Sequence, residues 1–230
     1  MPRSGGQKAQ IRGRFITFEG GEGSGKSTQI KLLADRLAAA KMRAIVTREP
    51  GGSPGAEIVR HLVLSGMGKL LGPEAETLLF AAARDDHVHT VIAPALERGV
   101  WVLCDRFADS TRAYQGKLGH VDPRIVNAME RVTIGDLKPD LTIILDIPVE
   151  VGLQRAAARR GSATPDRFEA EDINFHQRLR EAYRQIAADE PQRCVLIDAN
   201  ADSTTVAGRV WGALRERLMT SNARSEIVRA

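Results

Sequence analysis

A glycine-rich run near the start of the chain has the composition of a phosphate-binding loop. Residues 20–27 read Gly-Gly-Glu-Gly-Ser-Gly-Lys-Ser and fit the pattern G-x-x-x-x-G-K-[ST]. Glycines let successive backbone N–H groups converge on phosphate oxygens, while Lys26 adds a full charge and Ser27 offers a hydroxyl to Mg²⁺. No Asn-Lys-x-Asp guanine-reading motif follows a later strand, which favours ATP over GTP. The residues predicted to bind ATP are Gly20, Gly21, Glu22, Gly23, Ser24, Gly25, Lys26, Ser27 and Thr28.

A carboxylate follows the apolar run Val100–Cys104, which is typical of a buried strand. This residue, Asp105, would lie at the carboxyl edge of a parallel sheet, where open α/β sheets bind ligands. It could hold Mg²⁺ directly or through water, or it could only cap the following turn. The adjacent Arg106 carries a guanidinium that can clamp a phosphate. We predict catalytic roles for Lys26, Asp105 and Arg106, and metal ligation by Ser27 and Asp105.

Four arginines surround an irregular stretch in the second half of the chain. Arg155, Arg159 and Arg160 precede the Gly-Ser-Ala-Thr-Pro stretch at 161–165, and Arg167 follows it. This composition predicts a mobile loop. A lid at about residues 155–171 would bring one or more of these arginines to a transferring phosphate, whose charge must be neutralised. The alternative is that they are solvated cations at a helix end.

Apolar runs alternate with helical patterns along the chain, which predicts an α/β fold with a parallel sheet. Five runs suit strands buried on both faces. They are Phe15–Phe18, Ala44–Thr47, Val100–Cys104, Leu141–Leu145 and Cys194–Ile197. Helices are expected at Ser27–Ala40, Glu74–Glu97, Pro123–Val132, Val149–Arg159, Ile173–Ala188 and Thr204–Met219. Pro94 should kink or terminate the second of these near residue 93.

Length and composition are those of one soluble globular domain. The chain has 230 residues, of which 43% are hydrophobic and 27% charged. We expect a single P-loop kinase domain at 13–219 and flexible tails at 1–12 and 220–230. Cys104 and Cys194 each lie in a predicted strand, which favours reduced buried thiols and a cytoplasmic location. No apolar run has the length of a transmembrane helix or the pattern of a signal peptide, so no membrane partner is expected.

Several of these stretches together closely resemble bacterial thymidylate kinases, and they span nearly the whole chain apart from its tails. They are residues 18–28 (FEGGEGSGKST), 47–52 (TREPGG), 79–84 (LFAAAR), 105–116 (DRFADSTRAYQG) and 139–142 (PDLT). The resemblance implies a P-loop NTPase fold of the nucleoside monophosphate kinase type, with a five-stranded parallel sheet flanked by helices. It also implies Mg²⁺-dependent transfer of the γ-phosphoryl group of ATP to thymidine monophosphate, giving thymidine diphosphate and ADP.

The resemblance assigns residues to the acceptor as well. Phe80 would stack on thymine and Arg84 would bind its polar edge, while Arg48 and Arg106 would bind the monophosphate. Aromatic rings and guanidinium groups suit those tasks. From the residues alone, Phe80 is most simply a core residue.

Further acceptor contacts follow from the same resemblance. Glu22 would lie near the 3′-hydroxyl of the acceptor sugar, and Tyr114 would crowd a ribose 2′-hydroxyl, which implies a preference for deoxyribose. Ser110, Thr111 and Gln115 belong to the stretch that lines the acceptor base, and we assign them to substrate binding.

Members of this family take the transition-state arginine either from the phosphate-binding loop, after its carboxylate, or from the lid. Gly23 follows Glu22 here, so the chain resembles the lid-arginine type, with Arg160 and then Arg159 as the catalytic candidates. Phe107 departs from the family, where Tyr or His is common, which removes a polar group. The lid is also longer than expected.

Two alternative functions remain compatible with the sequence. One is a kinase for another nucleoside monophosphate. The other is a P-loop ATPase switch that binds nucleic acid or a protein, because the formal charge is +4; however, eight of the 33 basic residues lie in the terminal segments. We expect no nucleic-acid partner. By the resemblance we expect a homodimer, with an apolar interface from the helices around residues 54–64 and 74–97.

Overall fold

A computed structural model describes residues 12–165 and 167–219 of the chain. Its centre is one five-stranded sheet with the order β2-β3-β1-β4-β5, and all neighbouring strands are parallel. The strands are β1 (Phe15–Glu19), β2 (Ala44–Arg48), β3 (Trp101–Asp105), β4 (Leu141–Asp146) and β5 (Cys194–Asp198). Each predicted strand is present within a residue of its expected bounds, so the predicted fold class is confirmed.

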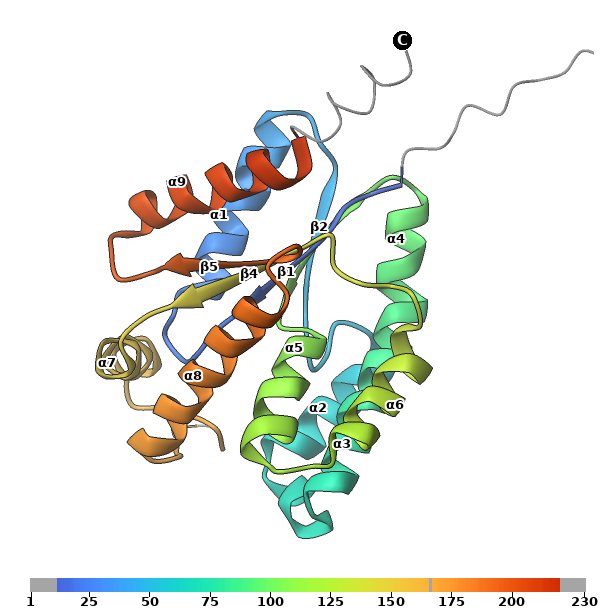
Figure 1. Cartoon of the computed structure of the whole chain (residues 1–230), viewed down its shortest axis with the longest axis vertical. Coiled ribbons are helices and arrows are strands. Elements are labelled where there is room, and N and C mark those ends of the chain that lie inside the picture. The colour runs from blue at the N-terminus through green and yellow to red at the C-terminus, as the bar shows by residue number, and fades with distance from the viewer. Residues whose placement is uncertain (1–11, 166, 220–230) are drawn as a thin grey trace, which may run out of the picture.

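Helices cover both faces of the sheet (Figure 1). The α-helices are α1 (Lys26–Ala39), α2 (Pro54–Leu64), α3 (Pro73–His87), α4 (Ala93–Glu97), α5 (Ala108–Thr111), α6 (Pro123–Ile134), α7 (Val149–Arg160), α8 (Ile173–Asp189) and α9 (Ser203–Leu214). The other helical segments are η1 (Met67–Leu71, 3-10) and the π-helical η2 (Val88–Ile92), η3 (Arg112–Leu118) and η4 (Arg215–Met219). A single layered α/β unit thus positions the loops at the strand ends.

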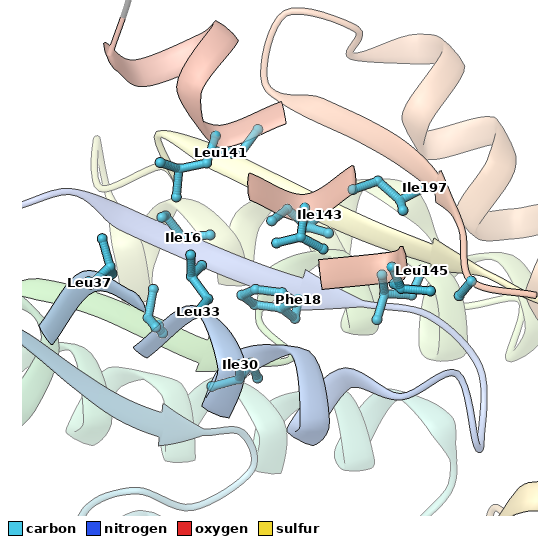
Figure 2. Packing of buried hydrophobic residues seen from close by; sticks show 14 of the residues in the cluster. Ile16, Phe18, Ile30, Leu33, Leu37, Leu141, Ile143, Leu145 and Ile197 are labelled. Atoms are coloured by element: carbon cyan, nitrogen blue, oxygen red, sulfur yellow. The ribbon is translucent and has the colours of Figure 1, made fainter. Parts of the chain in front are cut away.

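The side chains of β1 alternate between two apolar clusters, as the period of a strand requires. Ile16 and Phe18 face α1 and α9 in the cluster of Figure 2, which also contains Ile143 and Leu145 of β4. Phe15 points to the opposite face and packs with residues of η2, α4 and β3. Since β1 is buried on both faces and flanked by β3 and β4, the loop that follows it starts from the rigid centre of the molecule.

Two strand predictions are wrong in one respect. β2 and β5 were expected to be buried on both faces, but Val46 in β2 is 56% exposed and Leu196 in β5 is 43% exposed. Both strands are the edges of the sheet. Each therefore has a neighbouring strand along one edge only, and its outer side chains are less completely covered. An apolar composition alone does not distinguish an edge strand from a central one.

Pro94 was expected to kink or terminate its helix near residue 93, and of these two outcomes the termination is wrong. The run does not end near residue 93, because π-helical η2 follows α3 and α4 continues to Glu97. Pro94 has no N–H group to donate to the preceding turn, and the wider π-helical turn lies directly before it. The expected C-terminal helix similarly changes from α9 to π-helical η4 after Leu214.

The chain ends are only partly described. Residues 1–11 and 220–230, on which the prediction of flexible tails rests, lie outside the described residues. Among the described residues, no helix is long and apolar enough to cross a membrane. Cys104 and Cys194 are buried and unpaired, as predicted.

Candidate active site

The glycine-rich run forms the predicted loop between β1 and α1. Gly25 is the N-cap of α1 with φ of 93°, a left-handed conformation that favours glycine. The Lys26 side chain folds back over the loop, and its Nζ donates to Gly20 O at 3.1 Å and to Gly21 O at 3.0 Å. Burial and then the charge of Arg106 lower the pKa of Lys26. A bound anion would favour the charged lysine at this position.

Ser24, in the same loop, has a hydroxyl that lacks a partner. Its Oγ is buried and makes no hydrogen bond within the part of the chain that the structure describes. Buried hydroxyls are normally hydrogen-bonded. A phosphate oxygen bound in the loop would supply the missing partner.

The two predicted metal ligands meet at the carboxyl edge of the sheet. β3 ends at Asp105 and α1 begins beside it, so that Ser27 Oγ donates to Asp105 Oδ2 at 2.9 Å. No cluster of three or more metal-binding side chains exists among residues 12–165 and 167–219. Two oxygen ligands suit Mg²⁺, which usually takes few protein ligands and completes its octahedron with water and phosphate.

Two cavities meet at the phosphate-binding loop. The α3-side cavity has a volume of about 410 Å³ and lies between the loop, α3 and the segment that follows β3. The α9-side cavity has a volume of about 440 Å³ and extends from the loop to α9. Both are lined by Gly23, Ser24, Gly25, Thr28 and Arg159. The loop therefore separates two binding spaces that share a wall.

All nine residues that were predicted to bind the acceptor line the α3-side cavity. They are Glu22, Arg48, Phe80, Arg84, Arg106, Ser110, Thr111, Tyr114 and Gln115. Phe80 is only partly buried and belongs to none of the apolar clusters of the described chain, so the core interpretation of this residue is not supported. Gly20 and Gly21 line neither cavity and instead border a smaller one beside β4 and α8.

Arg84 is fixed by a buried carboxylate that the sequence analysis did not identify. Its Nε donates to Glu49 Oε2 at 2.8 Å, and both side chains are 5% exposed. The Nη2 atom of Arg84 donates to Phe107 O at 3.2 Å and to Thr111 Oγ1 at 3.0 Å. His87 Nδ1 lies 3.0 Å from the other oxygen of Glu49. Arg84 therefore enters the cavity in one orientation.

Arg106 lies between the loop and the segment after β3, with φ of 69°. Its Nη2 donates to Glu22 Oε1 at 2.7 Å. Burial opposes the ionisation of Glu22, but Arg106 and Lys26 hold the pKa of this carboxyl below its ordinary value. The floor of the α3-side cavity thus contains an ionised carboxylate beside two cations.

Glu19, the last residue of β1, is a fully buried carboxyl that supports this segment. Its Oε1 accepts from Phe107 N at 2.7 Å, and its Oε2 accepts from Ser110 Oγ at 2.7 Å. Burial, followed by the nearby charge of Asp109, raises the pKa of Glu19 from 4.5 to about 7. The folded protein therefore keeps a proton on Glu19 at pH values where the unfolded chain has lost it.

We predict that Glu19 makes the fold less stable as the pH rises from about 4.5 to 7. Below that window both states bind the proton; within it only the folded state does, so unfolding releases a proton and is favoured by higher pH. The difference in unfolding free energy between wild type and Glu19→Gln should fall by roughly 3 kcal/mol across the window. Urea titrations of both proteins at pH 5, 6, 7 and 8 measure it. A difference that is constant with pH would contradict the prediction.

The lid arginines occupy different environments. Arg159, with a side chain 64% exposed, lines both cavities, and its Nη2 donates to Glu169 Oε1 at 3.2 Å. Arg160 lines neither and donates to Glu169 Oε2 at 2.7 Å. Arg155 lines the α9-side cavity and donates to Ala199 O at 3.2 Å. Arg167 pairs with Glu76 of α3. The structure thus brings Arg159, rather than Arg160, to the junction of the cavities.

Two aromatic residues near the site have contacts that the sequence did not predict. Phe168, which was not predicted, lines the α3-side cavity and packs edge-on against Tyr114 at 5.0 Å between ring centroids. No sequence signal marked it, because the surrounding lid lacks periodicity. Phe107 is fully buried and packs edge-on against Phe15 at 4.8 Å, so an apolar ring suits this position.

The parallel sheet with its phosphate-binding loop at the central strand, and the two cavities that meet at that loop, define a P-loop kinase of the nucleoside monophosphate kinase class. The model of the thymidylate kinase family matches residues 18–209 of this sequence. The chain therefore belongs to the thymidylate kinase family.

Full-length relatives agree with this assignment. The chain is 80% identical over 223 residues to "Thymidylate kinase" of Bradyrhizobium diazoefficiens, covering 97% of this chain and 98% of that protein. It is 77% identical over 220 residues to "Thymidylate kinase" of Nitrobacter hamburgensis, covering 96% of each. It is 78% identical over 219 residues to "Thymidylate kinase" of Nitrobacter winogradskyi, covering 95% of each. The resemblance seen in the sequence is confirmed.

Proposed function

We propose that this chain transfers the γ-phosphoryl group of ATP to thymidine monophosphate, giving thymidine diphosphate and ADP, for deoxynucleotide synthesis. The observation that carries the proposal is the pair of cavities that meet at the phosphate-binding loop. A kinase needs donor and acceptor on opposite sides of the transferring phosphate, and this arrangement provides both sides. The shared name of the relatives supports thymidine monophosphate as the acceptor.

The α9-side cavity suits the nucleoside of ATP, and the loop suits its phosphates. Lys26 is buried among loop carbonyls, where its charge can follow the β- and γ-phosphates. Ser27 and Asp105 would hold Mg²⁺, which when bound offsets phosphate charge and orients the donor. The oxygen ligands fit this ion, and water or phosphate would complete its coordination.

The α3-side cavity suits the acceptor. Arg106 and the partly exposed Arg48 line this cavity and can bind the monophosphate, and Glu22 lies beside Arg106, where it can accept from the sugar 3′-hydroxyl. The fixed guanidinium of Arg84 can donate to a carbonyl of the base. Tyr114 is 9% exposed and held against Phe168, which leaves little room for a ribose 2′-hydroxyl.

A coupled assay with ATP and Mg²⁺ over a panel of nucleoside monophosphates tests the proposal. ADP formation should require a monophosphate, and thymidine monophosphate should give the highest kcat/KM. A different best acceptor would overturn the substrate assignment. ATP hydrolysis that is stimulated by polynucleotide, without a phosphorylated small-molecule product, would instead support a P-loop ATPase switch.

Phe80 provides a test of base binding. Stacking of a base on an aromatic ring is worth about 1–3 kcal/mol, so Phe80→Ala should raise the acceptor KM by about 5- to 150-fold. The KM for ATP should be unchanged, since Phe80 does not line the α9-side cavity. Steady-state kinetics with thermal melts measure both effects. A variant that mainly loses stability, with a normal acceptor KM, would assign Phe80 to the core.

We propose further that the protein is a homodimer. Six of the ten exposed large hydrophobic side chains of the described chain lie on α2, η1, α3 and α6, and these helices lie side by side in Figure 1. They are Ile58, Met67, Leu70, Leu71, Leu78 and Val132. Burying such a surface in a second copy removes it from water.

The two free buried thiols suit a reducing compartment, which supports the cytoplasm as the location.

Light scattering on the purified chain measures the predicted dimer. Ile58→Asp, at a side chain that is 74% exposed, should give a monomer because it would bury a charge in the interface. Leu32→Asp, on α1 outside this surface, is the matched control and should remain dimeric. A monomeric wild type would contradict the proposal.

A further inference from the structure

Tyr183 of α8 lies far from Arg106 in the sequence, but its hydroxyl touches the Arg106 guanidinium. Arg106 Nη1 donates to Tyr183 OH at 3.0 Å, to Gly20 O at 3.2 Å and to Ser110 Oγ at 3.4 Å. The tyrosine contact is the shortest of the three. The orientation of this nitrogen therefore depends strongly on a residue that lies beyond the lid.

The direction of the hydrogen bond is fixed by the guanidinium of Arg106. A guanidinium can only donate, so the Tyr183 oxygen must accept from Arg106 and direct its own proton elsewhere. Two acceptors for that proton lie nearby, Ser110 Oγ at 2.9 Å and Glu19 Oε2 at 3.1 Å, and Ser110 Oγ in turn donates to Glu19 Oε2 at 2.7 Å. Because Glu19 Oε1 is held by Phe107 N, the carboxyl cannot rotate away. Tyr183 thus presents its lone pairs to Arg106.

The Tyr183 ring has a rigid support. It is 2% exposed and packs in an apolar cluster with Leu179 and Ile186 of the same helix and with Ile144 of β4. The helix begins at Ile173, immediately after the lid segment. A hydroxyl on such a ring moves little, and it can hold a charged partner at one place.

We propose that Tyr183 is a positioning residue for the acceptor phosphate: its buried hydroxyl, which contacts Ser110 and Glu19, holds Arg106 in the geometry that binds the monophosphate. The proposal rests on the proposed function. Without the hydroxyl, Nη1 keeps only Gly20 O and a 3.4 Å contact with Ser110, whereas Nη2 keeps Glu22. The guanidinium would then turn about its bond to Glu22 and point less well into the α3-side cavity.

Tyr183→Phe tests this directly, because it removes one oxygen atom and keeps the ring. Loss of a hydrogen bond to a charged group should lower kcat/KM for thymidine monophosphate about tenfold. The KM for ATP should stay within about twofold, since Tyr183 lines no part of the α9-side cavity. Isothermal titration with thymidine monophosphate alone should show weaker binding by a similar factor.

A matched control separates positioning from packing. Ile186→Val removes one methylene group from the same cluster, one turn along α8, without touching the hydroxyl. It should lower Tm while leaving both KM values and kcat at wild-type levels. The same kinetic changes in Ile186→Val, or values within twofold of wild type in Tyr183→Phe, would overturn the inference. A wild type that phosphorylates no monophosphate would instead overturn the proposed function.

Discussion

Lys26→Ala should reduce kcat by about 10²–10³-fold or more, the scale for losing one preorganised transition-state donor. The lysine supplies a full charge that can follow the β- and γ-phosphates during transfer. It is 8% exposed and lies between loop carbonyls, so no solvent cation has ready access to the same position. Steady-state kinetics at saturating ATP and acceptor measure the effect. Turnover near the wild-type rate would remove Lys26 from its catalytic role.

Two further variants distinguish the charge of Lys26 from the packing of its side chain. Lys26→Met keeps most of the buried stem but not the charge, so it should lose as much activity as Lys26→Ala. Lys31→Ala, at an exposed position of the same helix, should keep wild-type kinetics. If the methionine variant were active and the alanine variant inactive, the side chain would act mainly by packing.

The frame of the site could be predicted because it rests on local signals. The glycine-rich run, the apolar strand before it and the amphipathic helix after it follow each other in sequence, and each has a recognisable pattern. Asp105 was placed correctly for the same reason, since a carboxylate after a buried strand must lie at the carboxyl edge of a parallel sheet. The nine acceptor residues needed the family resemblance in addition, because no period or spacing brings α3 to the segment after β3.

Contacts between distant segments could not be predicted. Glu49 fixes Arg84 from 35 positions away, and Tyr183 reaches Arg106 across 77 positions. Each pair joins buried or half-buried polar groups, and a search for apolar patterns in the sequence does not detect such contacts. The helical segment from α5 through η3 was missed for a related reason: Thr111 and Gln115 are buried polar residues on it, so the segment shows no apolar stripe.

The absence of an arginine from the phosphate-binding loop now has a steric explanation. A Cβ atom built on Gly23 would lie 1.9 Å from Gly152 O and 3.1 Å from Ala156 N, both in the backbone of α7. Gly23 also has φ of 64°, which strains any larger residue. No side chain fits at position 23 between the loop and this helix, so an arginine for the transferring phosphate has to come from another segment.

The face of α7 that touches the loop leads to the lid arginines. Gly152 and Ala156 are four residues apart and lie on one face of α7. Arg159 and Arg160 follow Ala156 by three and four residues, so they lie on the same face. Both arginines pair with Glu169, but Arg159 is 64% exposed and lines both cavities, whereas Arg160 is 24% exposed and lines neither. The sequence favoured Arg160; the geometry favours Arg159.

Arg159→Ala should therefore lower kcat more than Arg160→Ala does. An arginine that stabilises the transferring phosphoryl group is worth about 10³-fold or more in kcat, and the KM values should change little if it acts mainly in the transition state. Arg159→Lys keeps the charge but loses the planar fork, so it should recover only part of the rate. Arg178→Ala, at an exposed arginine of α8 that lines neither cavity, is the matched control and should be fully active. A larger loss in Arg160→Ala would transfer the role to Arg160 and would require that its pair with Glu169 opens before phosphoryl transfer.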